Sequence, residues 1–284
     1  MNVKDNPFSK KFCIQIGEKT IDFSTPKIMG VLNVTPDSFF DGGKNNSLEN
    51  ALLQAKKMIE EGVDIIDIGG YSSRPGAAEV SLEEELARTV PIVRAIHERF
   101  PEVILSIDTF RKTVAEMNID AGALFVNDIS AGNLDAEMIP WIKAKRIPYI
   151  AMHMRGNPQT MKTHCEYDNL LQDVVAELLD SLKELEDDHP LILDPGFGFS
   201  KTVDQNYELM NNLDCFAKLK QPFLVGVSRK SMIYKVLNSR PEYALNGTTV
   251  LNTVGVLSGA SVLRVHDVKE AKECVNLLNK VLAS

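Results

Sequence analysis

Residues 63–108 read VDIIDIGGYSSRPGAAEVSLEEELARTVPIVRAIHERFPEVILSID, and this stretch decides the fold. Two apolar runs, Val63–Ile68 and Val103–Ile107, flank Ser81–Phe100, in which apolar residues recur at the helical period. The helical stretch opens with SLEE, which matches the capping box that begins many helices. The order strand, loop, helix, strand predicts one unit of a parallel sheet with a helical crossover.

The same unit recurs along the whole chain, because eight short apolar runs each end in a polar or glycine-rich cluster. The runs are Lys27–Leu32, Val63–Ile68, Val103–Ile107, Ala123–Val126, Ile147–Met152, Pro190–Leu193, Pro222–Val227 and Ser261–Val265. Further amphipathic helices are predicted over Ser47–Glu61, Leu170–Leu185 and Val268–Leu282. Eight such units close into a (β/α)8 TIM barrel.

We therefore expect one domain over residues 1–284, with the barrel spanning 27–284. Residues 12–23 alternate apolar and polar side chains and predict an N-terminal β-hairpin that could cover the bottom of the barrel. An open doubly wound sheet is the structural alternative, but it usually has fewer strands. Its dinucleotide-binding form has no support, because no GxGxxG motif opens a helix.

Composition limits the classes of function. The chain has 31 Lys and Arg against 39 Asp and Glu, and its net charge of −8 argues against sequence-independent nucleic-acid binding. The four cysteines form no CxxC pair, which favours reduced thiols. The N-terminus resembles no signal peptide, and no apolar run is long enough to cross a bilayer. We expect a soluble cytoplasmic protein that binds neither nucleic acid nor membrane.

Polar side chains follow most of the eight runs at the point where each predicted strand ends. They include Asn33, Asp108, Asn127, Asp194, Lys230, Arg264 and His266. Taken alone, an Asp before Pro-Gly is more often a turn former, and an Arg-x-His pair more often lies at the surface or in a core. A barrel instead collects such residues at the C-terminal ends of its strands. The pattern therefore predicts an enzyme with one active site built from many strands.

Six motifs resemble the dihydropteroate synthase family, and they occur in the family's order. They are MGVLNVTPDSFFDGG (29–43), GGYSSRPGA (69–77), MHMRGNPQTM (152–161), LDPGFGF (193–199), GVSRKS (226–231) and RVHDV (264–268). The resemblance covers the chain from about residue 12 to the C-terminus. It implies a barrel that condenses 6-hydroxymethyl-7,8-dihydropterin pyrophosphate with p-aminobenzoate, giving 7,8-dihydropteroate and pyrophosphate.

The resemblance also implies a role for individual residues around the pterin. Asp194, with Asn127 and Asp108, matches the residues that recognise the pterin, and a carboxylate suits its adjacent N–H donors. Lys230 matches the lysine that contacts the pterin's acceptor atoms and closes over the second substrate. Met152 and Phe199 complete the expected pterin-binding set.

The leaving group and the second substrate have their own expected residues. Asn33 matches the one side chain that binds Mg²⁺ beside the pyrophosphate, an ion that keeps waters and takes other ligands from phosphate. Arg264 and His266 are expected to bind the pyrophosphate, and Arg264 could also lie against the pterin ring. Ser231, in a helix-like segment, is expected to bind the carboxylate of p-aminobenzoate, although an ordinary helix cap with two surface cations would look similar.

Two loops are expected to act as lids over p-aminobenzoate, although they could also be variable surface loops. Their matching positions are Thr35, Pro36, Phe39, Ser73, Arg74 and Pro75. The second loop departs from the family, which usually has Glu at position 71, where this chain has Tyr, and Thr at position 73, where it has Ser. These changes bear on lid contacts and inhibitor sensitivity more than on the reaction.

Other functions compete with this interpretation. A pterin-dependent methyltransferase barrel shares the Asp and Asn contacts to the pterin, and a non-catalytic pterin-binding protein is a further alternative. The family also implies a homodimer and competitive inhibition by sulfonamides, which resemble p-aminobenzoate. His153 and His164 could suggest a metal site, but without a local ligand pattern we interpret His153 as a packed residue at a strand end.

Overall fold

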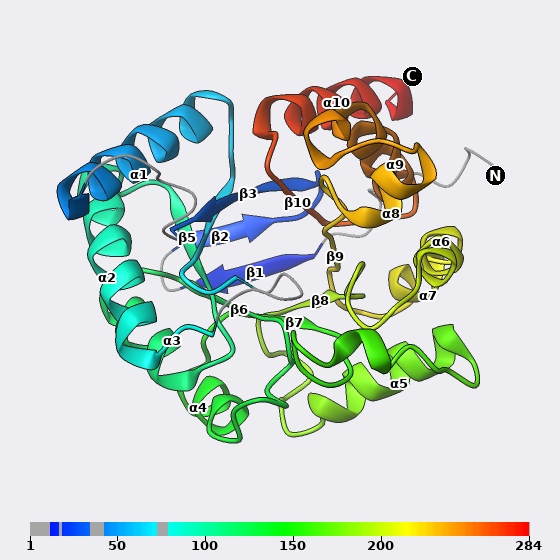
Figure 1. Cartoon of the computed structure of the whole chain (residues 1–284), viewed down its shortest axis with the longest axis horizontal. Coiled ribbons are helices and arrows are strands. Elements are labelled where there is room, and N and C mark those ends of the chain that lie inside the picture. The colour runs from blue at the N-terminus through cyan, green and yellow to red at the C-terminus, as the bar shows by residue number, and fades with distance from the viewer. Residues whose placement is uncertain (1–11, 17–18, 35–42, 73–78, 284) are drawn as a thin grey trace.

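The computed structural model describes residues 12–16, 19–34, 43–72 and 79–283, without the side chains of residues 43–47. Eight parallel strands form a sheet in the order β8-β7-β6-β5-β4-β3-β10-β9. A parallel bridge between Leu193 and Phe223 joins the two edges, so the sheet closes into a barrel ringed by helices (Figure 1). This confirms the predicted TIM barrel and rules out the open sheet.

The strands agree closely with the apolar runs. They are β3 (Lys27–Asn33), β4 (Ile65–Gly69), β5 (Ile104–Asp108), β6 (Phe125–Asp128), β7 (Tyr149–Met152), β8 (Leu191–Asp194), β9 (Leu224–Val225) and β10 (Val262–Val265). β9 is much shorter than its apolar run. Pro222 has no N–H to donate, and it contributes only a carbonyl that accepts a bond from Leu193 N at 3.0 Å.

The helices lie outside the barrel, and their caps explain where they begin. They are α1 (Gly43–Glu60), α2 (Leu82–Arg99), α3 (Lys112–Asp120), α4 (Met138–Lys145), α5 (Leu170–Ser181), α6 (Val203–Asn211), α7 (Asp214–Ala217), α8 (Ser231–Val236), α9 (Leu245–Leu257) and α10 (Val268–Leu282). Ser81 Oγ accepts a bond from Glu84 N at 3.1 Å. The Glu84 carboxylate pairs with Arg88 instead of returning to the cap, so half of the predicted capping box forms. Helix α5 ends four residues before the predicted Leu185.

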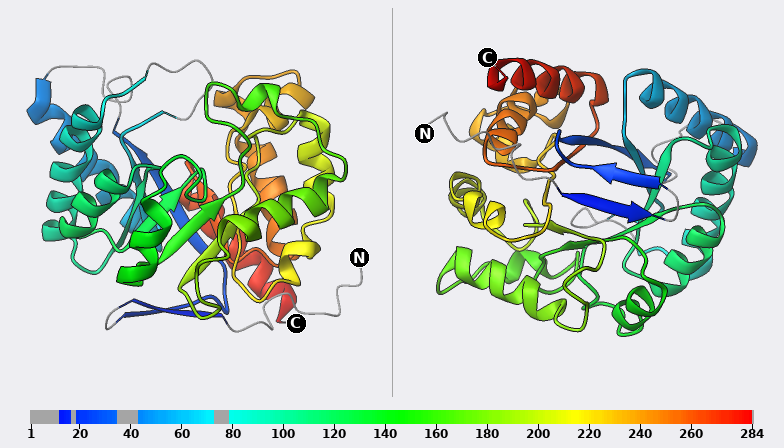
Figure 2. Two further views of the ribbon diagram at one scale, coloured as in Figure 1. Left: turned by 90° about the horizontal axis from the view of Figure 1, so that it is seen from below. Right: turned by 180° about the vertical axis from the view of Figure 1, so that it is seen from behind.

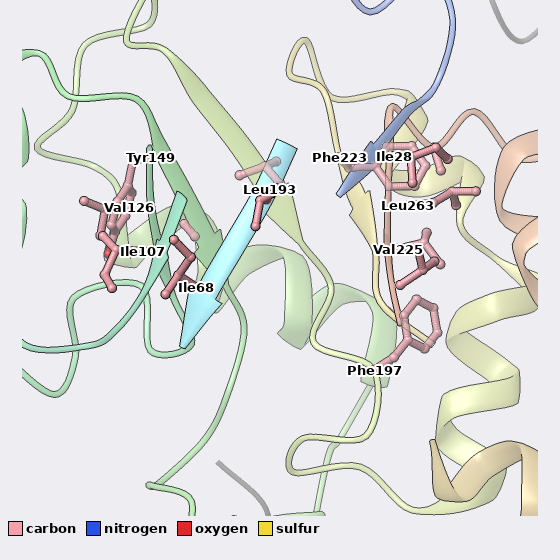
Figure 3. Packing of buried hydrophobic residues seen from close by; sticks show 14 of the residues in the cluster. Ile28, Ile68, Ile107, Val126, Tyr149, Leu193, Phe197, Phe223, Val225 and Leu263 are labelled. Atoms are coloured by element: carbon pink, nitrogen blue, oxygen red, sulfur yellow. The ribbon is translucent and has the colours of Figure 1, made fainter. Parts of the chain in front are cut away.

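Alternation along the strands divides the core into two layers. Outward side chains such as Ile68, Ile107, Val126, Val225 and Leu263 pack beneath the helices (Figure 3). Inward side chains at the N-terminal ends of the strands form a second cluster: Met29, Ile65, Phe125, Ile150, Ile192, Leu224 and Val262. These side chains form an apolar plug that fills the N-terminal half of the barrel. A ligand can therefore reach the interior only from the C-terminal ends of the strands.

An antiparallel hairpin of β1 (Cys13–Ile16) and β2 (Lys19–Asp22) covers the N-terminal mouth, as predicted. Its buried side chains Ile14, Ile16 and Ile21 belong to the same cluster as the apolar plug. Figure 2 shows the hairpin lying across that end of the barrel. The four cysteines are all free, in agreement with the expected reduced thiols. Within the described residues, no helix combines the length and the apolar character that a membrane span requires.

Candidate active site

The alternation that buries the apolar plug places polar side chains directly above it. On β4 the inward positions after Ile65 are Asp67 and Gly69, and the other strands follow the same period of two. Strand register then makes these residues neighbours around the ring. The paired positions include Asn33 with Gly69, Gly69 with Asp108, Asp108 with Asn127, and Met152 with Asp194.

One cluster joins three of the predicted residues, Arg264, Asp108 and Asn127, to Asp67, which was not predicted from the sequence. The Arg264 guanidinium donates to Asp67 Oδ2 at 2.7 Å and to Asp108 Oδ2 at 2.6 Å. Asn127 Nδ2 donates to the same Asp67 oxygen at 2.9 Å. Asp67 is fully buried, and its Oδ1 has no hydrogen-bond partner among the described residues. An aspartate inside an apolar run, two positions before the inward-facing Gly69, was the signal that could have revealed it.

The charges in this cluster depend on one another. Burial raises the pKa of the Asp108 carboxyl, Arg264 opposes that shift, and the neighbouring Asp67 adds to it. Burial also disfavours the charge on Arg264, but Asp67 and Asp108 outweigh it and raise the pKa of the guanidinium. Arg264 is therefore a fixed cation held between the side chains of two aspartates at the floor of the mouth.

Asp194 and Lys230 form the second part of the site. Asp194 Oδ1 accepts a bond from Gly196 N at 2.8 Å, so this residue also forms the turn that its Asp-Pro-Gly sequence favours. Lys230 Nζ donates to Phe197 O at 2.5 Å and lies 4.9 Å from the centre of the Phe199 ring. Burial raises the pKa of Asp194 against the pull of Lys230. Burial likewise lowers the pKa of Lys230 to about 8, which Asp194 opposes.

Asn33 lies at the mouth beside the Arg264 cluster. Its Oδ1 and Asp108 Oδ2 lie 3.8 and 3.6 Å from the point that a Cβ on Gly69 would occupy. An amide oxygen is a hard donor of the kind that Mg²⁺ accepts. In the described part of the chain, no group of three or more His, Cys, Asp or Glu residues could hold a metal ion. A metal at Asn33 would therefore depend on water and substrate oxygens, and the residue fits that sparse form of ligation.

In the segment Ser228–Ser231, the first two residues support neighbouring groups, whereas Ser231 begins a helix. Ser228 Oγ lies 3.0 Å from His266 Nδ1 and accepts the His266 backbone N–H at 3.2 Å, so it fixes that exposed histidine. Arg229 has a φ of 55° and forms an ion pair with Asp267 at 2.8 Å. It therefore supports the loop. Ser231 begins helix α8, as the sequence suggested, and is half-buried.

The histidine beside Met152 is packed, as predicted. His153 is 3% exposed, and its Nε2 and Nδ1 lie 3.1 Å from Glu177 Oε2 and 3.0 Å from Lys201 Nζ. Burial lowers its pKa to about 3, and Lys201 adds to that shift. Met152 is buried in a small cluster against which Phe199 packs.

Tyr71 stands where the family usually has Glu, and its ring belongs to an aromatic cluster. Its ring packs edge-on against Phe110 with centres 5.2 Å apart, and the Arg111 guanidinium lies 5.6 Å from its centre. Gln159 Nε2 donates to the Tyr71 hydroxyl at 3.0 Å. This position therefore joins three loops at the mouth. All six predicted lid residues lie outside the described part of the chain: Thr35, Pro36, Phe39, Ser73, Arg74 and Pro75.

Known proteins are similar to this chain in sequence and in fold. A family described as pterin binding enzyme matches residues 29–266. Dihydropteroate synthase of Escherichia coli K12 is 42% identical over 273 residues, which cover 93% of this chain and 95% of that protein. The Bacillus subtilis enzyme is 40% identical, covering 96% of this chain and 93% of its own.

Solved structures agree with that assignment. The Yersinia pestis dihydropteroate synthase in complex with a sulfonamide drug superimposes with a TM-score of 0.89 at 38% identity, covering 96% of this chain and all of that one. The Xanthomonas albilineans enzyme in complex with 7,8-dihydropteroate gives a TM-score of 0.86 at 30% identity, with coverages of 96% and 100%. The chain therefore belongs to the pterin-binding enzymes and, within them, to the dihydropteroate synthases.

Proposed function

We propose that this protein joins 6-hydroxymethyl-7,8-dihydropterin pyrophosphate to p-aminobenzoate at the C-terminal mouth of its barrel. The products are 7,8-dihydropteroate and pyrophosphate. The observation that carries the proposal is the ring of inward polar side chains centred on Arg264, on a chain that matches dihydropteroate synthases over almost its full length. Related structures bind 4-aminobenzoic acid and 7,8-dihydropteroate.

The pterin would lie above the apolar plug. One oxygen of Asp194 already serves its own turn, and its carboxylate can still accept the adjacent N–H groups of the pterin edge. Asn127 and Asp108 offer mixed donors and acceptors from neighbouring strands. Lys230 would donate to the pterin's acceptor atoms, while Met152 and Phe199 supply apolar contact.

The leaving pyrophosphate requires cationic and N–H donors. Arg264 is held in place by two carboxylates, and His266 is held by Ser228, so both can donate without reorganising. Asn33 is the residue that would hold Mg²⁺, which when bound would neutralise charge on the phosphate oxygens. Asn33→Ala should therefore raise the magnesium concentration needed for turnover. Full turnover of the variant at limiting magnesium would contradict this assignment.

The reaction is a displacement at the methylene carbon on the pterin. The C–O bond to pyrophosphate breaks, and the electron-rich dihydropterin stabilises positive charge on that carbon. The amine nitrogen of p-aminobenzoate then forms the C–N bond and loses a proton to solvent. Because the cation is reactive and the arylamine proton is acidic once the bond has formed, the scheme needs no covalent enzyme intermediate and no strong general base.

Ser231 and the two loops that follow β3 and β4 are proposed to bind p-aminobenzoate. Ser231 is half-buried at the start of α8, next to Lys230, and its hydroxyl can donate to a carboxylate. Sulfonamides should compete with p-aminobenzoate for this position, as the sulfonamide-bound relative suggests. Steady-state kinetics should show that p-aminobenzoate relieves the inhibition. Inhibition that no concentration of p-aminobenzoate relieves would contradict the shared subsite.

We also propose a homodimer and a cytoplasmic location. Helices α9 and α10 pack side by side on the outside of the barrel and expose three large apolar side chains, Val250, Leu277 and Val281. A partner copy would remove these from water. Sedimentation equilibrium should give twice the chain mass, and Leu277→Asp should shift it toward the monomer. A wild-type monomer at micromolar concentration would contradict this proposal.

A further inference from the structure

A second charged cluster lies next to the pterin site and takes no part in the steps above. Lys201 and His153 are 8% and 3% exposed, and Glu177 and Arg155 complete the group. Burying a lysine is costly unless its donors are satisfied. The cluster connects the end of β7 with the loop between β8 and α6, which begins directly after Asp194.

That loop has an unusual backbone. Gly196, Gly198 and Ser200 all have positive φ, at 72°, 82° and 45°. A Cβ on Gly196 would lie 2.0 Å from His153 O, so the two chain segments cross in contact there. Ser200 is not glycine, so its left-handed conformation is strained. Such a loop keeps one shape only if the surrounding groups hold it.

Lys201 holds the loop from inside. Its Nζ lies 3.1 Å from Gly196 O, 3.2 Å from Phe199 O and 3.0 Å from His153 Nδ1. An ammonium group has three N–H donors, and these three acceptors use all of them. Burial lowers the pKa of Lys201 to about 7, while the nearby Asp194 carboxylate favours the charged form.

The network also fixes the tautomer of His153. Since Nδ1 accepts from the ammonium, the ring proton must be on Nε2, where it donates to Glu177 Oε2. Glu177 is in turn bound by Arg155, which lowers the pKa of that carboxyl. Ser200 is held from the same side, because Arg155 N donates to its Oγ at 3.0 Å.

We propose that Lys201 is a positioning residue for pterin recognition: its ammonium locks the β8–α6 loop onto His153 and thereby sets the Asp194 carboxylate and the Phe199 ring. The inference rests on the proposed pterin-binding role of Asp194. Lys201 touches neither substrate; it acts through the two ends of the loop. Losing it should weaken pterin binding and leave the p-aminobenzoate subsite, built on other elements, largely unchanged.

The test compares Lys201→Met with Lys218→Met, a matched control at an exposed lysine that directly follows helix α7 and pairs with Asp214. We expect the Kd of the dihydropterin pyrophosphate, measured by calorimetry, to rise at least tenfold in Lys201→Met. The KM for p-aminobenzoate should stay within threefold, and Lys201→Arg should recover part of the pterin affinity. An unchanged pterin Kd in folded Lys201→Met, or equal losses for both substrates, would overturn the proposal.

A measurement on the wild-type protein covers the case in which Lys201→Met does not fold. Nitrogen-15 spectra of the His153 ring should show a neutral imidazole protonated at Nε2 from pH 6 to pH 8. Protonation at Nδ1 would overturn the network. These results are separable from the proposed function, because wild-type product formation tests that function without reference to Lys201.

Discussion

The substitution Asp67→Asn tests how far the site depends on the charge beneath Arg264. Asp67 Oδ2 accepts from both Arg264 and Asn127, whereas Oδ1 has no partner among the described residues. An asparagine can therefore place its oxygen where Oδ2 lies and keep both hydrogen bonds. What it loses is the negative charge. Because Asp108 is also proposed to contact the pterin, Asp67 is the counter-ion of Arg264 that has no proposed contact with a substrate.

The expected loss follows from the strengths of these bonds. A hydrogen bond to a charged group contributes roughly 1.5 to 3 kcal/mol and one between neutral groups roughly 0.5 to 1.5. In Asp67→Asn the bond from Asn127 becomes one between neutral groups while the bond from Arg264 keeps its cation, so removing the carboxylate charge costs at least about 1 to 1.5 kcal/mol. Since about 1.4 kcal/mol corresponds to a tenfold change in rate, kcat/KM should fall about tenfold. Asp67→Ala also removes both bonds and, at about 3 kcal/mol or more, should lower kcat/KM over about 100-fold.

Steady-state assays of pyrophosphate release would measure these effects, with circular dichroism to check the fold. Asp64→Asn is the matched control, because Asp64 lies at the N-terminal side of the same strand. There it accepts from Ile28 N at 2.8 Å and Lys272 Nζ at 3.2 Å. Its kcat/KM should stay within twofold of wild type. If folded Asp67→Asn behaved like this control, the electrostatic role of Asp67 would be refuted.

Three further predictions concern stability and the mouth of the barrel. Gly196→Ala should lower the free energy of unfolding by at least about 3 kcal/mol in urea titrations, since it combines left-handed strain with a 2.0 Å clash; Gly226→Ala, whose nearest contact would be 3.6 Å, should cost under about 1 kcal/mol. Burial raises the pKa of Asp108 to about 7, so between about pH 4 and 7 the folded protein binds a proton that the unfolded chain has lost. The contribution of this group to stability therefore falls as pH rises through that window, and Asp108→Asn should flatten the slope; an unchanged slope would contradict the assignment. Tyr71→Phe removes only the bond from Gln159 and should cost under about 1 kcal/mol in urea titrations, whereas a larger loss would show that the hydroxyl, not the ring, holds the cluster.

The period-two alternation of the strands made most of the fold and much of the ring predictable. Once eight apolar runs imply a barrel, the residue that ends each run must lie at one mouth, and Arg264 with Asp108 shows that such residues meet. Which residues of the ring contact one another was harder to predict from the sequence. Asp67 lies inside an apolar run, where a polar residue looks like an interruption of the strand. Only the closed barrel shows that this buried side chain faces Arg264.

The contacts made by loop residues could not be predicted, for a different reason. Arg229 stands between Ser228 and Lys230 in a basic motif, yet its left-handed backbone turns it toward Asp267. Lys201 looks like a surface lysine in sequence, but its three acceptors are brought together only by the folded loop. In both cases the decisive information is backbone conformation, which side-chain periodicity does not encode.

Product formation by the wild-type protein and by Asp194→Asn, measured side by side, tests the central claim most directly. Given the dihydropterin pyrophosphate, p-aminobenzoate and Mg²⁺, the wild-type protein should release dihydropteroate and pyrophosphate in equal amounts. Asp194→Asn should keep the fold and lose more than about 100-fold in kcat/KM, because an amide presents an N–H where the pterin requires an acceptor. Saturable pterin binding without product in the wild type, or an Asp194→Asn enzyme of unchanged activity, would contradict the account.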